Sequence, residues 1–237
     1  MADQLYLSLW YPNFRFEALP GALVGVMRQF AAISGENRVF AATVYPISFN
    51  ESPTWQRIYV NDSRAQENQD TSGSIIENAV AEATEHLHDD MAYEFEMRWN
   101  LWAPQTDDDF HNRLDEAPDP ESQRAFGRLD TLWKPQPSTV RILGFGPNFD
   151  DAAYEQNGHI RIDFGLDTPW LAETLEDEDL DRNSAQDAAQ HIQQNVEMLL
   201  AFTLSVEKHC GISSRLLWTE SGEPLAQKLI DRLQRLN

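Results

Sequence analysis

The stretch YEFEMRWNLW, residues 93–102, alternates apolar and polar side chains without a break. Its apolar members are every second residue: Tyr93, Phe95, Met97, Trp99 and Leu101. Strict alternation of this length is typical of a β-strand that buries one face and exposes the other. We therefore predict a strand over residues 92–102 whose charged face looks out of the core.

The residues before this strand predict a β-α-β-β-α-β order. Alternating or β-branched runs predict strands over residues 5–10, 38–48 and 54–60, and apolar residues at helical spacing predict helices over 18–33 and 74–90. This order is that of a ferredoxin-like, or split βαβ, unit. For residues 1–102 we expect such a unit, with an antiparallel sheet and both helices packed on one face.

The second half of the chain predicts further strands and two C-terminal helices. An acidic connection with several prolines, residues 103–137, comes first, and residues 138–237 follow as a ββαβα unit. Its predicted elements are strands at 138–146, 159–166 and 213–218 and helices at 185–209 and 223–236. The fold class is therefore α+β, and the two halves form either two units or one continuous domain.

The acidic side chains are concentrated in two segments. The formal net charge of the 237 residues is −21. Residues 103–123 carry seven acidic side chains against one arginine, a net −6, and residues 167–187 carry eight against one, a net −7. Such a field repels phosphate backbones and anionic membrane surfaces, so nucleic acid and membrane are not expected partners. The two segments are either solvated loops or a surface for a basic protein partner.

The chain has one cysteine, Cys210, so no internal disulfide can form, and we interpret it as a small packed thiol. The N-terminal residues contain no basic stretch followed by a long apolar run. We therefore expect a cytoplasmic protein.

The motif HLHDDM, residues 86–91, comes closest to a catalytic signature. His86, His88 and Asp90 match the His-x-His-x-Asp-His pattern of the metallo-β-lactamase superfamily, but Met91 replaces the last histidine. The predicted helix 74–90 would also point His86 and His88 apart, because residues two apart on a helix do not face each other. We interpret them as exposed histidines near a helix end, and we expect no metal and no cofactor.

Polar positions on three predicted strands define a candidate binding surface. Strand 159–166 repeats the strict alternation of strand 92–102, and strand 138–146 adds one arginine to the same pattern. If these strands share a sheet, their charged side chains lie on one surface, with Trp102 at its rim. The candidate binding residues are Glu94, Glu96, Arg98, Trp102, Arg141, Arg161 and Asp163. An ordinary solvated sheet face is the alternative interpretation.

These patterns contain no complete catalytic signature, which favours a non-enzymatic binding or regulatory protein. The leading hypothesis is an inhibitor-like or immunity-like protein whose acidic segments mask a basic protein. A small-molecule-binding protein or enzyme with a site on the polar sheet face is the second hypothesis. A structural subunit of a homo-oligomer is the third.

Overall fold

The computed structural model describes residues 3–59, 74–104, 133–151, 153–171 and 182–221. The predicted helix 223–236 and most of the connection 103–137 lie outside these residues. The statements below concern the described residues.

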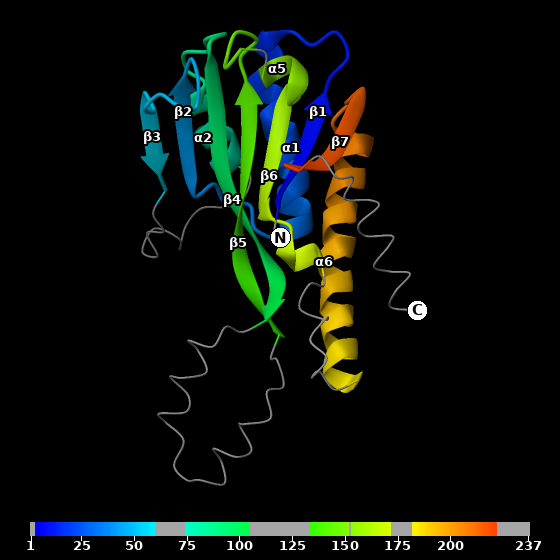
Figure 1. Cartoon of the computed structure of the whole chain (residues 1–237). Helices are drawn as coiled ribbons and strands as arrows, with labels where there is room; N and C mark the ends of the chain where they lie inside the picture. Colours follow the sequence, from blue (N-terminus) through cyan, green and yellow to red (C-terminus); the bar gives the residue numbers. More distant parts are fainter. Residues whose placement is uncertain (1–2, 60–73, 105–132, 152, 172–181, 222–237) are drawn as a thin grey trace.

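Seven strands form one antiparallel sheet (Figure 1). The strands are β1 (Gln4–Trp10), β2 (Ala41–Pro46), β3 (Trp55–Ile58), β4 (Met91–Pro104), β5 (Trp133–Phe145), β6 (Ile160–Leu166) and β7 (Ser214–Thr219). Their spatial order is β3-β2-β4-β5-β6-β1-β7. Strands from the first hundred residues and from the last hundred therefore lie side by side in the same sheet.

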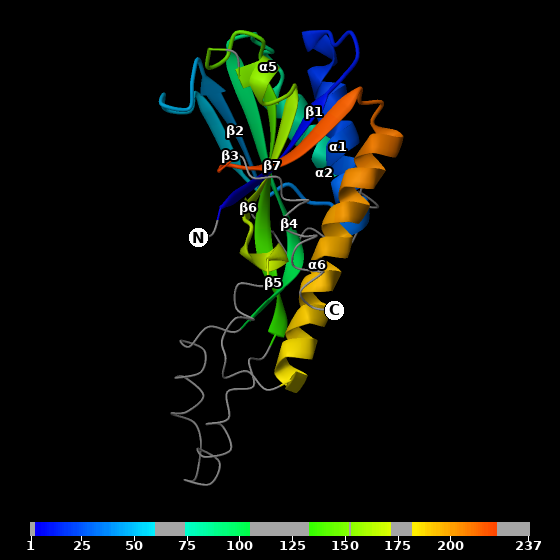
Figure 2. The ribbon, with the colours of Figure 1, turned by 45° about the vertical axis from the view of Figure 1, so that its right-hand side comes forward.

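Three helices cover one face of this sheet. They are α1 (Leu19–Ser34), α2 (Ser74–Ala83) and α6 (Arg182–His209), and Figures 1 and 2 show all three on the same side. The shorter elements are η1 (Phe16–Ala18), α5 (Ala153–Gln156) and η2 (Thr168–Trp170). None of the three long helices covers the opposite face, which we call the helix-free face, although the short α5 packs on one end of it through Ala153.

The α+β class and the antiparallel sheet are confirmed, but the ferredoxin-like strand order is wrong. A ferredoxin-like unit places its first and last strands next to each other. Here β5 and β6 lie between β4 and β1. Strand β5 pairs with β4 at the edge where β1 was expected to pair. Strand β1 pairs with β6 and β7 instead.

The core lies between the sheet and the three helices. The five apolar side chains of the opening stretch all point into it and are at most 2% exposed. Each contributes roughly 1.5–3 kcal/mol by burial. The Trp99 ring contacts Phe30 of α1, Phe164 of β6 and Trp170 of η2, so it joins three elements.

Two predicted boundaries are wrong. Helix α2 ends at Ala83 rather than near residue 90, and the Thr84 hydroxyl donates to the Val80 carbonyl at that end. Strand β5 begins at Trp133, inside the predicted connection. Pro135 and Pro137 are tolerated there because β6 pairs only with the far end of β5, which leaves these prolines on an open edge.

The buried Asn195 of α6 hydrogen-bonds the outer part of the β4–β5 pair. Its Oδ1 accepts from the Trp102 backbone N–H at 2.9 Å, and its Nδ2 donates to the carbonyls of Trp102 and Pro169, each at 2.8 Å. The Asn195 amide thus takes the place of a neighbouring strand for the Trp102 backbone, where β2 no longer pairs with β4.

Three loops meet at one end of the helix-free face, and we call residues 47–50, 86–91 and 146–151 the loop junction. Backbone N–H groups of Gly146 and Asn148 donate to the carbonyls of Met91 and Asp89 at 2.8 and 2.7 Å. A Cβ at position 146 would clash with the Asp89 carbonyl, so only glycine allows this approach.

Within the described part of the chain, no helix is long and apolar enough to cross a membrane.

Candidate functional site

The structure brings six of the seven candidate residues together on the helix-free face. Glu96, Arg141 and Asp163 lie in one row, because β4, β5 and β6 pair in the registers Glu96↔Arg141 and Arg141↔Asp163. Glu94 and Arg161 lie in the next row, on either side of Leu143. Arg98 follows on β4. Three carboxylates and three guanidiniums therefore balance each other on this face, although the whole chain is strongly acidic.

Arg141 bridges two of the carboxylates. Its Nε lies 3.5 Å from Glu96 Oε1, and its Nη1 lies 3.9 Å from Asp163 Oδ2. The Arg141 side chain is 50% exposed, so each pair is screened by solvent and contributes at most about 1 kcal/mol. These pairs explain the order of the charges better than they explain the stability of the fold.

Glu94 is a partly buried carboxylate of this face. Burial raises its pKa from its ordinary value, and Arg141, as the next largest influence, lowers it. Glu96 and Asp163 add like charge, which raises the pKa further. Burial therefore makes the charged form of Glu94 less favourable than it is in water.

Arg161 has an unusual environment for a partly buried cation. Its guanidinium carbon lies 5.2 Å from the ring centroid of Tyr6, 5.2 Å from that of Phe145 and 5.6 Å from that of Phe49. Its Nε is buried and has no hydrogen-bond acceptor. Among the described residues, no carboxylate forms an ion pair with it within 4.0 Å.

The acidic neighbours of Arg161 have other partners. Asp163 accepts from the Gly165 backbone N–H at 2.8 Å and faces Arg141. Glu96 faces Arg141 as well, and Glu94 hydrogen-bonds the Tyr45 hydroxyl. The buried Nε–H of Arg161 therefore has no acceptor among the described residues, although the charges of Asp163, Glu94 and Asp150 lie near its guanidinium.

Phe49 reaches the face from the loop junction. The centroid of its ring lies 5.0 Å from that of Phe149 and 5.3 Å from that of Tyr45. Together with Phe145, these rings form an aromatic cluster at one end of the face. The preceding Ile47 has φ = 59°, an unfavourable conformation for a β-branched residue. Two backbone hydrogen bonds of 2.7 Å hold it there: the Ile47 N–H donates to the Asp90 carbonyl, and the Ile47 carbonyl accepts from the Asp150 N–H.

On the other side of Arg161, a second aromatic surface extends toward β7. The Tyr6 ring lies 4.6 Å from the Trp218 ring, and Trp218 Nε1 donates to the Ser8 hydroxyl at 3.0 Å. Both rings are partly exposed, so together with the guanidinium they form part of the surface of this face.

Trp102 does not join the other six residues, so its expected place at the rim is wrong. Its ring stacks on His191 of α6, with centroids 4.0 Å apart, and packs with Trp133. The β4–β5 pair twists once it leaves the sheet, and this turns the polar side of β4 toward α6. Trp102 is therefore a packing residue on the helix side.

His86 and His88 lie in the loop junction rather than on a helix, since α2 ends at Ala83. The argument that a helix would point their side chains apart therefore does not apply. Nevertheless, within the described ranges no three His, Cys, Asp or Glu side chains are arranged to hold a metal ion.

The aromatic part of the Arg161 site was missed from sequence. The alternation of residues 5–10 already placed Tyr6 on a polar side, which was a usable signal. No pattern placed Phe49 near Arg161, because Phe49 comes from a loop. No protein-family model, no curated protein and no solved structure matches this chain, so the function rests on these contacts.

Proposed function

We propose that the protein is a non-enzymatic binding protein whose helix-free face holds a carboxylate-bearing ligand, with Arg161 as its anchor. A ligand carboxylate would accept from the Arg161 guanidinium. An apolar group attached to that carboxylate would lie on Tyr6 and Trp218. This develops the hypothesis of a site on the polar sheet face.

The unsatisfied environment of Arg161 carries the proposal. Three carboxylates interact with the charge of Arg161, but none accepts from its buried Nε–H, and leaving a buried donor unsatisfied costs about 1–3 kcal/mol. Contacts with aromatic faces return about 0.5–2 kcal/mol each. A carboxylate offers what the rings cannot, an acceptor for the buried Nε–H, and a planar guanidinium binds it through two parallel hydrogen bonds.

The hypothesis of a basic protein partner at the acidic segments stays a prediction. Residues 105–123 and 172–181, which carry most of the acidic side chains of the two segments, lie outside the described ranges. The hypothesis of a homo-oligomeric structural subunit also stays a prediction.

Binding of phenylacetate, measured by calorimetry and by the NMR signal of the Arg161 Nε–H, tests the proposal. Its neutral isostere phenylacetamide is the control ligand. Saturable binding of phenylacetate should move the Arg161 signal, and phenylacetamide should bind at least about tenfold more weakly, because a hydrogen bond to a charged group is worth about 1.5–3 kcal/mol.

Variants then assign the site. Arg161→Met should weaken phenylacetate binding by about tenfold or more, whereas Arg161→Lys should retain part of it as a point charge. Arg98→Met is the matched control, because Arg98 lies on the same face but stacks on Phe40 at 4.1 Å. Equal affinity of Arg161→Met and the unaltered protein, or no saturable binding of phenylacetate, would contradict the proposal.

A further inference from the structure

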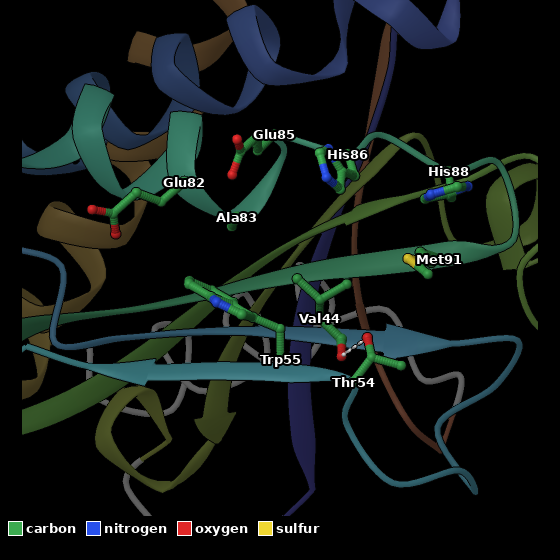
Figure 3. A pocket seen from close by; sticks show the side chains of 9 residues that line it. All are labelled: Val44, Thr54, Trp55, Glu82, Ala83, Glu85, His86, His88 and Met91. Atoms are coloured by element: carbon green, nitrogen blue, oxygen red, sulfur yellow. Dashed lines mark hydrogen bonds between the residues drawn. The ribbon is translucent and has the colours of Figure 1, made fainter.

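A second candidate site lies on the helix side of the sheet, at its β3 edge. A cavity of about 260 Å³ separates the end of α2 from strands β2 and β3 (Figure 3). Trp55 and Val44 rise into it from the strands, and Glu85, His86 and His88 border it from the loop after α2. It is distinct from the Arg161 site, which lies on the helix-free face.

Hydrogen bonds with the buried Tyr93 hydroxyl fix the loop that borders this cavity. The buried Tyr93 hydroxyl accepts from the His88 backbone N–H at 2.8 Å and lies 3.3 Å from the His86 carbonyl, to which it donates. The loop end is also tied to β5, since Gly146 donates to Met91. The cavity therefore has a preformed wall, although that wall is not a helix or a strand.

The two glutamates of the cavity differ in their partners. Glu82 Oε2 lies 2.8 Å from Arg57 Nη1 and accepts from the Tyr59 hydroxyl at 3.1 Å, so its charge is already compensated. The exposed Glu85 carboxylate has no ion-pair partner among the residues whose positions are described. One uncompensated carboxylate thus borders the cavity, across it from the partly exposed indole of Trp55 (Figure 3).

We infer that this cavity binds a small organic cation, a guanidinium or an alkylammonium group, stacked on Trp55 and paired with Glu85. Tryptophan is the side chain that attracts cations most strongly through its ring face. The net charge of −21 favours the approach of cations. The two imidazoles add ring nitrogens that can hydrogen-bond the N–H groups of the ligand.

The size of the cavity limits the ligand. Pockets for drug-sized molecules usually measure about 300–1,000 Å³. At about 260 Å³, this cavity suits one cationic group with a short aliphatic stem. We therefore expect weak binding, with a dissociation constant on the order of 1 mM.

The test is an NMR titration with butylguanidinium, using its neutral isostere butylurea as the control ligand. The reporter is the indole N–H of Trp55, assigned by its loss in Trp55→Leu. Butylguanidinium should shift this signal saturably, and butylurea should bind at least about fivefold more weakly. Equal binding of the two ligands, or a Trp55 signal that does not move, overturns the inference.

Two variants locate the cation. Glu85→Gln should weaken butylguanidinium binding by roughly two- to fivefold, the range of an exposed ion pair. Glu155→Gln changes an exposed glutamate on α5, remote from the cavity, and should leave binding unchanged. Trp55→Leu should weaken binding about fivefold, read from loop signals. Because Glu85 is exposed, its variant should melt like the unaltered protein, so loss of folding cannot mimic the result. Unchanged binding by Glu85→Gln overturns the inference.

The same titration separates two sources of the cation. Acetyl-Gly-Arg-Gly-amide presents the guanidinium on an extended backbone, next to the edge strand β3. Tighter binding of this peptide than of butylguanidinium would assign the cavity to an arginine side chain of a partner protein. Equal binding would assign it to a free organic cation, and either result supports a cation site.

Discussion

The two faces of strand β4 carry equally regular side chains, but those side chains have different physical roles. On the helix side, five apolar residues are at most 2% exposed and lie in one continuous core. On the helix-free side, Glu94, Glu96 and Arg98 meet other charges or a ring, and solvent screens most of these contacts. Burial accounts for the stability of the sheet, whereas the charged contacts contribute little to it. Regular alternation therefore identifies both faces of the strand, but only the buried face accounts for the stability of the sheet.

The largest effect is expected on the helix side. Trp99→Ala should lower the free energy of unfolding by about 3–5 kcal/mol, because it removes a buried ring and leaves a cavity. Arg98 directly precedes Trp99 but lies on the other face. Arg98→Ala should lower the free energy of unfolding by no more than about 1 kcal/mol, the value of its exposed contact with Phe40. Denaturant unfolding monitored by circular dichroism measures both. Similar losses for the two variants would break the comparison.

A smaller loss should follow from the buried amide that docks the β4–β5 pair on α6. Asn195→Leu keeps the volume but leaves the backbone groups of Trp102 without partners, which should cost about 2–3 kcal/mol. Gln194→Leu, at an exposed position of the same helix, should stay within about 0.5 kcal/mol. Thermal melting compares them. A stable Asn195→Leu protein would mean that water satisfies these groups.

The charged network of the helix-free face should contribute less still. Arg141→Gln removes the bridge between Glu96 and Asp163 and should destabilise the protein by less than about 1 kcal/mol, because the guanidinium is half exposed. The loss should shrink further at high salt. Denaturant unfolding at two salt concentrations provides the measurement, and a loss above about 2 kcal/mol would assign this network to the stability of the fold.

The smallest effect concerns the protonation of Glu94. Its folded-state pKa is raised above the ordinary 4.5, chiefly by burial. The folded protein therefore holds a proton that the unfolded chain has released, and the stability from this group falls as pH rises from 4.5 through the raised folded pKa. Glu94→Gln should remove that decline, so the variant gains on the unaltered protein across this interval and keeps the gain at neutral pH. Urea unfolding at several pH values checks the sign, and a variant that loses stability at neutral pH would reverse it.

Local patterns predicted most of the elements, but they could not predict what lies next to what. The alternation of residues 93–102 identified β4 and its two faces, because alternation is a property of one strand. Whether β5 and β6 lie between β4 and β1 depends on long-range pairing, which no local pattern records. The end of α2 was missed for a related reason. Leu87 continues the apolar spacing and still packs against the core, although it lies in a loop.

The candidate site was predictable to the same extent. Five of the six charged residues could be placed on one face because they lie on the two strands with strict alternation, 92–102 and 159–166, and Arg141 was added from the strand predicted between them. Trp102 obeyed the alternation as well, but the twist of a two-stranded pair beyond the sheet turned it toward α6. Phe49 and the cavity at Trp55 depend on loops whose positions are set by tertiary contacts.

The loop junction makes the two proposed sites parts of one mechanical unit. Phe49, which lies against Arg161, follows Ile47, and Ile47 is hydrogen-bonded to the loop that carries His86 and His88. Asn148 links the third loop to Asp89 through both its backbone and its side chain. The loop junction therefore connects Arg161, through Phe49, to the loop that borders the cavity at Trp55. If a ligand at Arg161 shifts Phe49 and with it this loop, thermodynamic linkage requires a cation in the cavity to change the affinity for that ligand by the same free energy.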